Sequence, residues 1–268
     1  MFKSLHHSGR LLILPNIWDV SGALLLKDLQ FPAVATASAA VAITNGYEDG
    51  EKIPFAELLR ILKKMVQKLD LPVSADIESG YAGSTHQLGE NIKKLIGAGI
   101  VGINLEDTNK KTKRIYPIEQ QCERIQKVRS VAQAAGIELF INARTDVYIR
   151  SATSISAEEK LKETIKRGLA YREAGASGFF PIAMKEKTDL LQVVSKVDLP
   201  LNVITIAGIP SLSELEGLGV ARVSLGPSLL KFAMQSMKHL AEKLKSHEGL
   251  NDIFENEITS DYLRMLVT

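Results

Sequence analysis

Acidic side chains follow two short apolar runs of the sequence, and each run has the length of a buried strand. The first run stops at Asp76 and Glu78, in the segment 76–81 (DIESGY), and the second stops at Glu106, in the segment 102–107 (GINLED). Residues two apart on a strand point to the same side, so Asp76 and Glu78 share a face, which Glu106 can join from a neighbouring parallel strand. The sequence therefore predicts three carboxylates that converge at strand ends.

Carboxylates that lie this close repel one another unless a cation or a proton intervenes. A hard divalent ion with oxygen ligands is the simplest way to hold them, and we predict a Mg²⁺ site, with Mn²⁺ as the alternative ion, at Asp76, Glu78 and Glu106. The alternative interpretation is that Asp76 and Glu78 are helix caps or solvated loop residues, as most acidic residues are.

A third strand-like run, 138–143, brings a basic group to the same predicted edge. It ends in the segment 142–146 (NARTD), where Asn142 and Arg144 are two apart and are expected to face the acidic cluster. The rigid fork of an arginine suits a carboxylate or a phosphonate, so Arg144 is a candidate for substrate binding. The alternative is that Arg144 forms an ion pair with Asp146 or with the acidic cluster itself.

Strand-like runs alternate with amphipathic helical stretches along the whole chain, which indicates a parallel sheet. The predicted strands are 11–14, 33–36, the run ending at 76, and then 101–105, 138–143, 178–182, 201–205 and 222–225. Eight strands and about 250 residues fit a closed (β/α)8 TIM barrel, in which active sites lie at the carboxyl ends of the strands. A doubly wound sheet is the alternative, but no glycine-rich dinucleotide turn follows the first strand. We expect one domain over residues 1–268.

The charge of the chain is nearly balanced, with 33 basic and 31 acidic residues and a net charge of +2. This balance gives no basic field for nucleic acid or a membrane surface, so a small-molecule ligand is expected. The amino terminus lacks a signal-peptide apolar core, and no apolar run approaches the roughly 20 residues that span a bilayer. We expect a cytoplasmic protein, and the single cysteine, Cys122, suits a reducing compartment.

Two helical stretches, 228–244 and 256–266, end the chain, and the second is one more than a barrel requires. Its apolar stripe must be buried somewhere, and it consists of Ile258, Tyr262, Leu263 and Leu266. The segment 250–268 is expected to pack either on its own barrel or on a partner subunit. The second alternative predicts a homo-oligomer.

Together these segments resemble the isocitrate lyase and phosphoenolpyruvate mutase superfamily. The resemblance covers roughly residues 11–237 and rests on the order and spacing of DIESGY, GINLED and NARTD, with TASA at 36–39 and YEDG at 47–50 as further matches. Each motif is weak alone, and the set is specific. The resemblance implies a (β/α)8 barrel whose last helix is exchanged between subunits, usually within a tetramer. We therefore expect a homo-oligomer, either a dimer or a tetramer.

The resemblance also implies roles for single residues. Asp76 would be the direct Mg²⁺ ligand, and Asp49, Glu78 and Glu106 would hold the ion largely through water. Arg144 would bind the substrate carboxylate. The region of Ser38 would supply backbone and hydroxyl donors to that carboxylate, and Asn142 is kept as a further candidate catalytic residue.

Two positions depart from the pattern of the family. The lyases carry a lid with a catalytic cysteine, whereas here the lid region 108–116 begins TNKKTKR and has no cysteine. Cys122 lies beyond it in a predicted helix. Better-known members also have aspartate where Glu78 stands, which places the chain in a less characterised branch with a changed substrate.

The expected activity is that of a Mg²⁺-dependent lyase-type enzyme that cleaves a carbon–carbon bond in a small 2-oxo or 2-hydroxy carboxylate through a metal-stabilised enolate. Phosphorus–carbon chemistry, as in phosphoenolpyruvate mutase or phosphonopyruvate hydrolase, is the alternative. Two further alternatives are a Schiff-base aldolase, for which Lys185 is the candidate, and a barrel that binds a metabolite without turnover.

Overall fold

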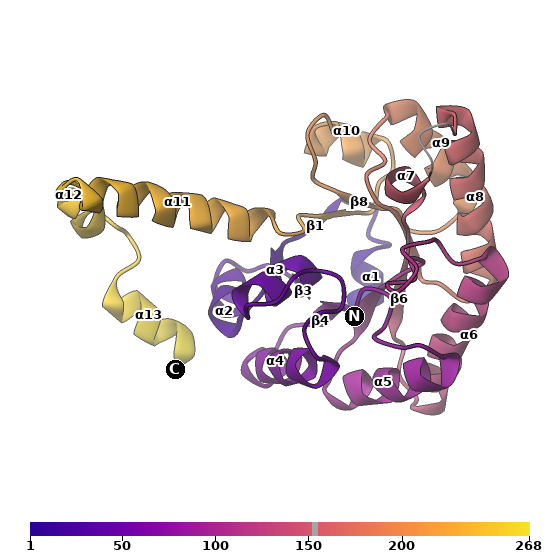
Figure 1. Cartoon of the computed structure of the whole chain (residues 1–268), viewed down its shortest axis with the longest axis horizontal. Coiled ribbons are helices and arrows are strands. Elements are labelled where there is room, and N and C mark those ends of the chain that lie inside the picture. Colours follow the sequence, from indigo (N-terminus) through magenta and orange to yellow (C-terminus); the bar gives the residue numbers. More distant parts are fainter. Residues whose placement is uncertain (152–154) are drawn as a thin grey trace.

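The computed structural model describes residues 1–151 and 155–268, and its parallel strands form a closed barrel (Figure 1). The strands are β1 (Leu12–Leu14), β2 (Asn16–Ile17), β3 (Val34–Thr36), β4 (Val73–Asp76), β5 (Gly102–Glu106), β6 (Phe140–Thr145), β7 (Gly178–Pro181), β8 (Asn202–Ile204) and β9 (Arg222–Ser224). They pair in the orders β2-β3-β4-β5-β6-β7 and β1-β9-β8. A parallel bridge from Phe179 to Leu201 joins β7 to β8, so the predicted TIM barrel is confirmed.

The first strand of the barrel is divided in two by Pro15. β1 pairs with β9 on one side, and β2 pairs with β3 on the other. Proline has no backbone N–H, so it cannot donate to the ladder of either neighbour. The sequence prediction ended this strand at residue 14, and the structure continues it to Ile17.

The helices of the described residues lie mainly on the outside of the barrel, apart from those at the C-terminal end of the chain. They are α1 (Phe2–Leu5), α2 (Val20–Asp28), α3 (Ser38–Thr44), α4 (Phe55–Lys68), α5 (Thr85–Gly97), α6 (Ile118–Ala134), α7 (Val147–Arg150), α8 (Ala157–Glu173), α9 (Lys187–Val197), α10 (Leu212–Gly217), α11 (Ser228–Lys245), α12 (Leu250–Phe254) and α13 (Ser260–Val267). In α4, Leu58, Leu62 and Met65 recur on one side and are buried. Within the described residues, no helix combines the length and the apolar character that crossing a membrane requires.

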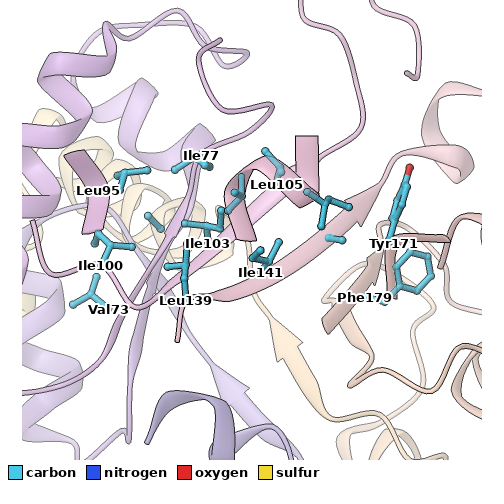
Figure 2. Packing of buried hydrophobic residues seen from close by; sticks show 14 of the residues in the cluster. Val73, Ile77, Leu95, Ile100, Ile103, Leu105, Leu139, Ile141, Tyr171 and Phe179 are labelled. Atoms are coloured by element: carbon cyan, nitrogen blue, oxygen red, sulfur yellow. The ribbon is translucent and has the colours of Figure 1, made fainter. Parts of the chain in front are cut away.

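Side chains alternate between the two sides of each barrel strand, and this alternation separates the hydrophobic core from the site. On β5, Ile103 and Leu105 belong to the hydrophobic cluster between the strands and the helices (Figure 2). Asn104 and Glu106 point the other way and are also buried. The polar members of this strand therefore lie in the barrel interior, at the level where β4, β5 and β6 end.

The C-terminal helices leave the barrel. Helix α11 projects away from it as an arm, with α12 at the far end, and α13 returns toward α2 (Figure 1). The hydroxyl of Tyr262 on α13 donates to Asp28 on α2 at 2.7 Å. On the arm, Phe232 and Met237 are 71% and 69% exposed. The last helix therefore touches its own chain, while the arm itself carries apolar side chains that nothing in the described chain covers.

Candidate active site

The strand ends bring the predicted acidic and basic residues to one mouth of the barrel. Glu106 at the end of β5 is the register partner of Arg144 on β6, and Asp76 ends β4 next to them. Glu78 lies two residues beyond Asp76, in a turn where its φ of 52° is left-handed. Such a conformation is unfavourable for a residue with a side chain and is common at functional sites. A backbone N–H of Glu51 donates to Glu78 Oε1 at 2.7 Å and fixes the carboxylate in this turn.

Two of the predicted metal ligands share a cation that belongs to the chain itself. The ammonium Nζ of Lys110 lies 2.7 Å from Glu78 Oε2 and 2.6 Å from Glu106 Oε1. Both carboxylates are 2% exposed and Lys110 is 15% exposed. We call these three side chains the carboxylate–lysine cage.

The electrostatics of the cage follow from its burial. Burial raises the pKa of Glu106 to about 7 and also raises the pKa of Glu78, although the ammonium of Lys110 opposes both shifts. For Lys110, burial acts to lower the pKa, but the two carboxylates outweigh it and raise the pKa above its usual value. The carboxylates are therefore costly to ionise in this site without a cation between them.

Arg144 lies beside the cage and is held by two carboxylates. Its Nη1 is 3.1 Å from Glu106 Oε2, and its Nε donates to Asp146 Oδ1 at 2.7 Å. Burial acts to lower the pKa of Arg144, but Glu106 and Asp146 raise it, so the guanidinium stays charged. The ion pair with Asp146 that the sequence left open is present, and it orients the guanidinium toward Glu106.

Asp76 is bound to Ser38 rather than to the cage. Its Oδ2 accepts from the backbone N–H of Ser38 at 3.1 Å and from its Oγ at 2.7 Å. The N–H of Glu78 lies 3.4 Å from the other oxygen, Oδ1. Ser38 begins helix α3, which the sequence did not predict as a helix, so the backbone donors at this end of α3 face the carboxylate.

The two remaining predicted residues lie further from the cage. Asp49 is exposed in a turn, and its negative charge adds to the rise of the pKa of Glu78. Asn142 lies two residues below Arg144 on β6, where its Nδ2 donates to Asn104 Oδ1 at 2.8 Å. Asn142 is therefore in the floor of the site, in contact with another amide.

The carboxylate oxygens of Asp76, Glu78 and Glu106 are of the type that binds a divalent cation, although the three side chains do not converge on a single point in this structure. No three His, Cys, Asp or Glu side chains of residues 1–151 and 155–268 are grouped closely enough to hold a metal ion. Glu78 and Glu106 nevertheless hold a cationic group between them, and Asp76 is adjacent. Carboxylate oxygens are the ligands that Mg²⁺ and Mn²⁺ prefer, and these three residues would hold such an ion.

Behind the site, Asp107 forms a second buried ion pair. It is completely buried and accepts from Tyr171 Oη at 2.7 Å, from the N–H of Asp146 at 2.9 Å and from Arg167 Nη1 at 3.2 Å. Since Asp146 holds Arg144, this network positions the guanidinium of the site. The sequence contained Asp107 in the GINLED segment but gave no signal that residues of a later helix would contact it.

Sequence reasoning also missed the role of Lys110, which it placed in the lid region 108–116 next to three other basic residues without assigning it a partner. Its position four residues after Glu106 was the only signal. Lys185, the candidate for a Schiff base, is exposed and lines a separate cavity of about 460 Å³ with Lys187 and Glu214. Cys122 is half-buried on α6, where its Sγ lies 3.5 Å from the carbonyl oxygen of Ala170.

Comparison with known proteins gives the family. The family model described as phosphoenolpyruvate phosphomutase matches residues 2–245. The chain is 29% identical to 2-methylisocitrate lyase of Bacillus subtilis, covering 94% of this chain and 84% of that one. It is 27% identical to oxaloacetate decarboxylase of Pseudomonas putida, covering 81% and 73%. A crystal structure from Burkholderia cenocepacia, provisionally assigned as a phosphonomutase, is 38% identical with a TM-score of 0.86 and covers 90% of this chain and 97% of that one. The chain therefore belongs to the phosphoenolpyruvate phosphomutase family, within the isocitrate lyase and phosphoenolpyruvate mutase superfamily.

Proposed function

We propose that the protein is a divalent-metal-dependent lyase-type enzyme that cleaves a carbon–carbon bond in a small 2-oxo or 2-hydroxy carboxylate. The observation that carries this proposal is the buried pair Glu78 and Glu106, which share a cationic group at 2.7 and 2.6 Å next to Arg144. The mouth of this TIM barrel therefore holds a cation-binding pair of carboxylates beside a guanidinium, at the end of the barrel where active sites of this fold lie.

The side chains of the mouth divide the work of binding such a substrate. Arg144, oriented by Asp146, presents the guanidinium fork that matches a carboxylate. Ser38 offers an N–H and a hydroxyl from the start of α3, both now donated to Asp76. A divalent ion held by Asp76, Glu78 and Glu106, with Mg²⁺ favoured over Mn²⁺, would supply Lewis-acid stabilisation of the negative charge that develops on the substrate oxygen.

The relatives favour carbon–carbon cleavage, and one of them supports an alternative. A 2-methylisocitrate lyase and an oxaloacetate decarboxylase are among the relatives. The structure provisionally assigned as a phosphonomutase supports phosphorus–carbon chemistry as the second candidate. Cys122 does not fill the place of the missing lid cysteine, because its thiol contacts Ala170 on the outside of the barrel and burial raises its pKa.

The test is a substrate screen with purified protein. Oxaloacetate, 2-methylisocitrate-type acids and phosphonopyruvate are incubated with Mg²⁺ and, in parallel, with EDTA, and the products are followed by mass spectrometry. We expect turnover of a 2-oxo or 2-hydroxy acid that stops with EDTA and in Arg144→Lys, since lysine lacks the planar fork. Turnover that persists in EDTA would contradict the proposal, and binding without turnover of any candidate would favour a metabolite-binding barrel.

We also propose that the protein is a homo-oligomer, a dimer or a tetramer, in which the arm formed by α11 packs on a partner subunit. Its exposed Phe232 and Met237 support this, together with an apolar groove of about 620 Å³ between α2, the start of α11 and α13. Phe232→Glu is expected to reduce the molar mass measured by light scattering, and Gln235→Glu, on an exposed polar position of the same helix, is expected to leave it unchanged.

A further inference from the structure

The loop that carries Lys110 is a compact hairpin rather than an open lid. An antiparallel bridge joins Thr108 to Ile115, and the N–H of Asn109 donates to the carbonyl of Arg114 at 2.9 Å. The side chain of Thr108 donates to Asp146 at 2.6 Å, which ties the base of the hairpin to the end of β6. The base of the hairpin is therefore fixed next to the site. Between residues 109 and 114, the side chain of Lys110 contacts the barrel through its ion pairs.

Only one of the four cations of this hairpin enters the barrel mouth. Lys111, Lys113 and Arg114 are exposed, whereas Lys110 reaches Glu78 and Glu106. The two oxygens that it contacts, Oε2 of Glu78 and Oε1 of Glu106, are buried and have no hydrogen-bond partner among the described residues beyond this ion pair. The ammonium of Lys110 therefore does two things: it neutralises these two carboxylate oxygens, and it holds the hairpin against the barrel mouth.

We propose that Lys110 is the resident cation of the carboxylate cage, and that a divalent metal ion enters by exchange with it, which moves the tip of the hairpin, residues 109–114, outward while its base at Thr108 and Ile115 stays in place. This inference rests on the proposed function, because it assumes that the same carboxylates bind the metal. The physical reason is competition for the same oxygens: an ammonium at 2.6 and 2.7 Å occupies the direction from which an ion would be coordinated. A divalent ion and an ammonium held on the same two carboxylates would also repel each other at close range in a buried site.

The structure offers the displaced lysine another environment. A cavity of about 730 Å³ adjoins the cage, and Lys110 is among the residues that line it. Two carboxylates, Glu51 and Glu123, line the same cavity, together with the cations Lys111 and Arg124 and the polar side chain of Gln87. An ammonium that leaves the cage can therefore regain solvent and acidic neighbours without unfolding the base of the hairpin.

Exchange has a consequence for the protein without metal. Two buried carboxylates left without a cation repel each other, and Lys110 removes this repulsion. Removing the lysine should leave Glu78 without its cation and Glu106 with Arg144 as its ion-pair partner, and the pair should then bind a divalent ion more tightly. Lys110 therefore lowers metal affinity, and it couples occupation of the cage to the position of the hairpin.

The first experiment measures Mn²⁺ binding by electron paramagnetic resonance in the wild-type protein, in Lys110→Met and in the control Lys113→Met. Both variants lose one positive charge from the same hairpin, but Lys113 is exposed. We expect Lys110→Met to bind Mn²⁺ about tenfold or more tightly than the wild type, and Lys113→Met to bind within about twofold of it. Equal affinity in Lys110→Met and the wild type would overturn the exchange and leave the proposed function intact.

The second experiment uses the wild type and therefore does not depend on the folding of a variant. An amine-reactive reagent labels the protein with EDTA or with saturating Mn²⁺, and the rate at each lysine is read by mass spectrometry. The labelling rate of Lys110 is expected to rise about tenfold on adding Mn²⁺, because its ammonium leaves two ion pairs, with Lys113 unchanged. Bound Mn²⁺ with Lys110 still protected overturns the exchange alone, whereas no Mn²⁺ binding in any variant overturns the metal site and the exchange together.

Discussion

Glu106 and Asp107 are neighbours in the chain and belong to two different kinds of buried ion pair. Glu106 points into the barrel mouth and meets Lys110, which comes from a hairpin, and Arg144. Asp107 points away from the mouth and meets Arg167 and Tyr171, which both come from α8. The alternation of side chains at the end of β5 thus places the candidate metal site on one side of the strand and the ion pair with α8 on the other.

The partners of the two carboxylates explain this difference. Asp107 is held by a hydroxyl and a guanidinium on α8 and by the backbone N–H of Asp146, directly after β6, so its network has one arrangement. The shortest contact of Glu106 is with an ammonium on a hairpin whose other cations are exposed to solvent. We infer that Asp107 contributes mainly to stability and Glu106 mainly to binding.

The largest effect is expected for Asp107→Asn. The substitution keeps the shape of the side chain but removes the buried carboxylate that Arg167 Nη1 contacts and leaves Arg167 paired with the partly exposed Glu163, so the free energy of unfolding should fall by about 3 kcal/mol. Chemical denaturation measures this change. Glu106→Gln is the matched variant on the other side of the strand, and a loss as large as that of Asp107→Asn would break the distinction between the two residues.

The second effect concerns metal binding. Here the change at Glu106 should have the large effect, and a change in the Asp107 network should have the small one. Glu106→Gln removes one negative charge from the cage, so Mn²⁺ affinity should fall about 100-fold, which corresponds to about 2.7 kcal/mol. Isothermal titration calorimetry measures this affinity. Tyr171→Phe, which alters the Asp107 network, should change it by less than about threefold. A larger loss in Tyr171→Phe than in Glu106→Gln would refute the proposed division.

A smaller effect on stability is expected for Tyr171→Phe. Its hydroxyl donates to Asp107 Oδ2 at 2.7 Å in a fully buried position, so its removal should cost about 1–2 kcal/mol of unfolding free energy. Thermal and denaturant unfolding provide the measurement. An unchanged stability would mean that Arg167 and the N–H of Asp146 suffice to hold the carboxylate.

Sequence reasoning was strongest where periodicity carries the information. The strands and the meeting of Glu106 with Arg144 follow from the alternating β and α pattern and from polar residues at strand ends. Helix α3 was missed because its small residues show no amphipathic stripe; Ala40, Val41 and Ala42 are all buried.

Two sets of contacts could not be predicted from the sequence: those of Lys110 in the hairpin and the ion pair between Asp107 and Arg167. Four cations between residues 110 and 114 look alike, and only the fold of the hairpin selects Lys110 to enter the mouth. The partnership of Asp107 with Arg167 joins residues 60 apart. Its existence depends on how α8 packs against the barrel, which no local pattern specifies.

A further effect, similar in size to that of Tyr171→Phe, is a difference in the pH dependence of stability. Because the pKa of Glu106 is raised to about 7 in the folded protein, the folded state holds a proton that the unfolded state has released between about pH 4.5 and pH 7. This group therefore favours folding at low pH, and its contribution is lost as the pH rises through that window. The unfolding free energy of the wild type should fall relative to Glu106→Gln by about 1–3 kcal/mol between pH 5 and pH 7. Parallel curves for the two proteins would show that Glu106 does not titrate there.

The most direct test of the barrel mouth as a metal-dependent carboxylate site is the effect of oxalate on the melting temperature. Oxalate carries two adjacent carboxylates and serves as a stable probe, and a ligand that binds only the folded state raises the melting temperature. We predict a rise with oxalate and Mg²⁺ together, which is lost when EDTA replaces Mg²⁺ and in Glu106→Gln. An equal rise with EDTA, or in Glu106→Gln with Mg²⁺, would contradict the role assigned to these carboxylates.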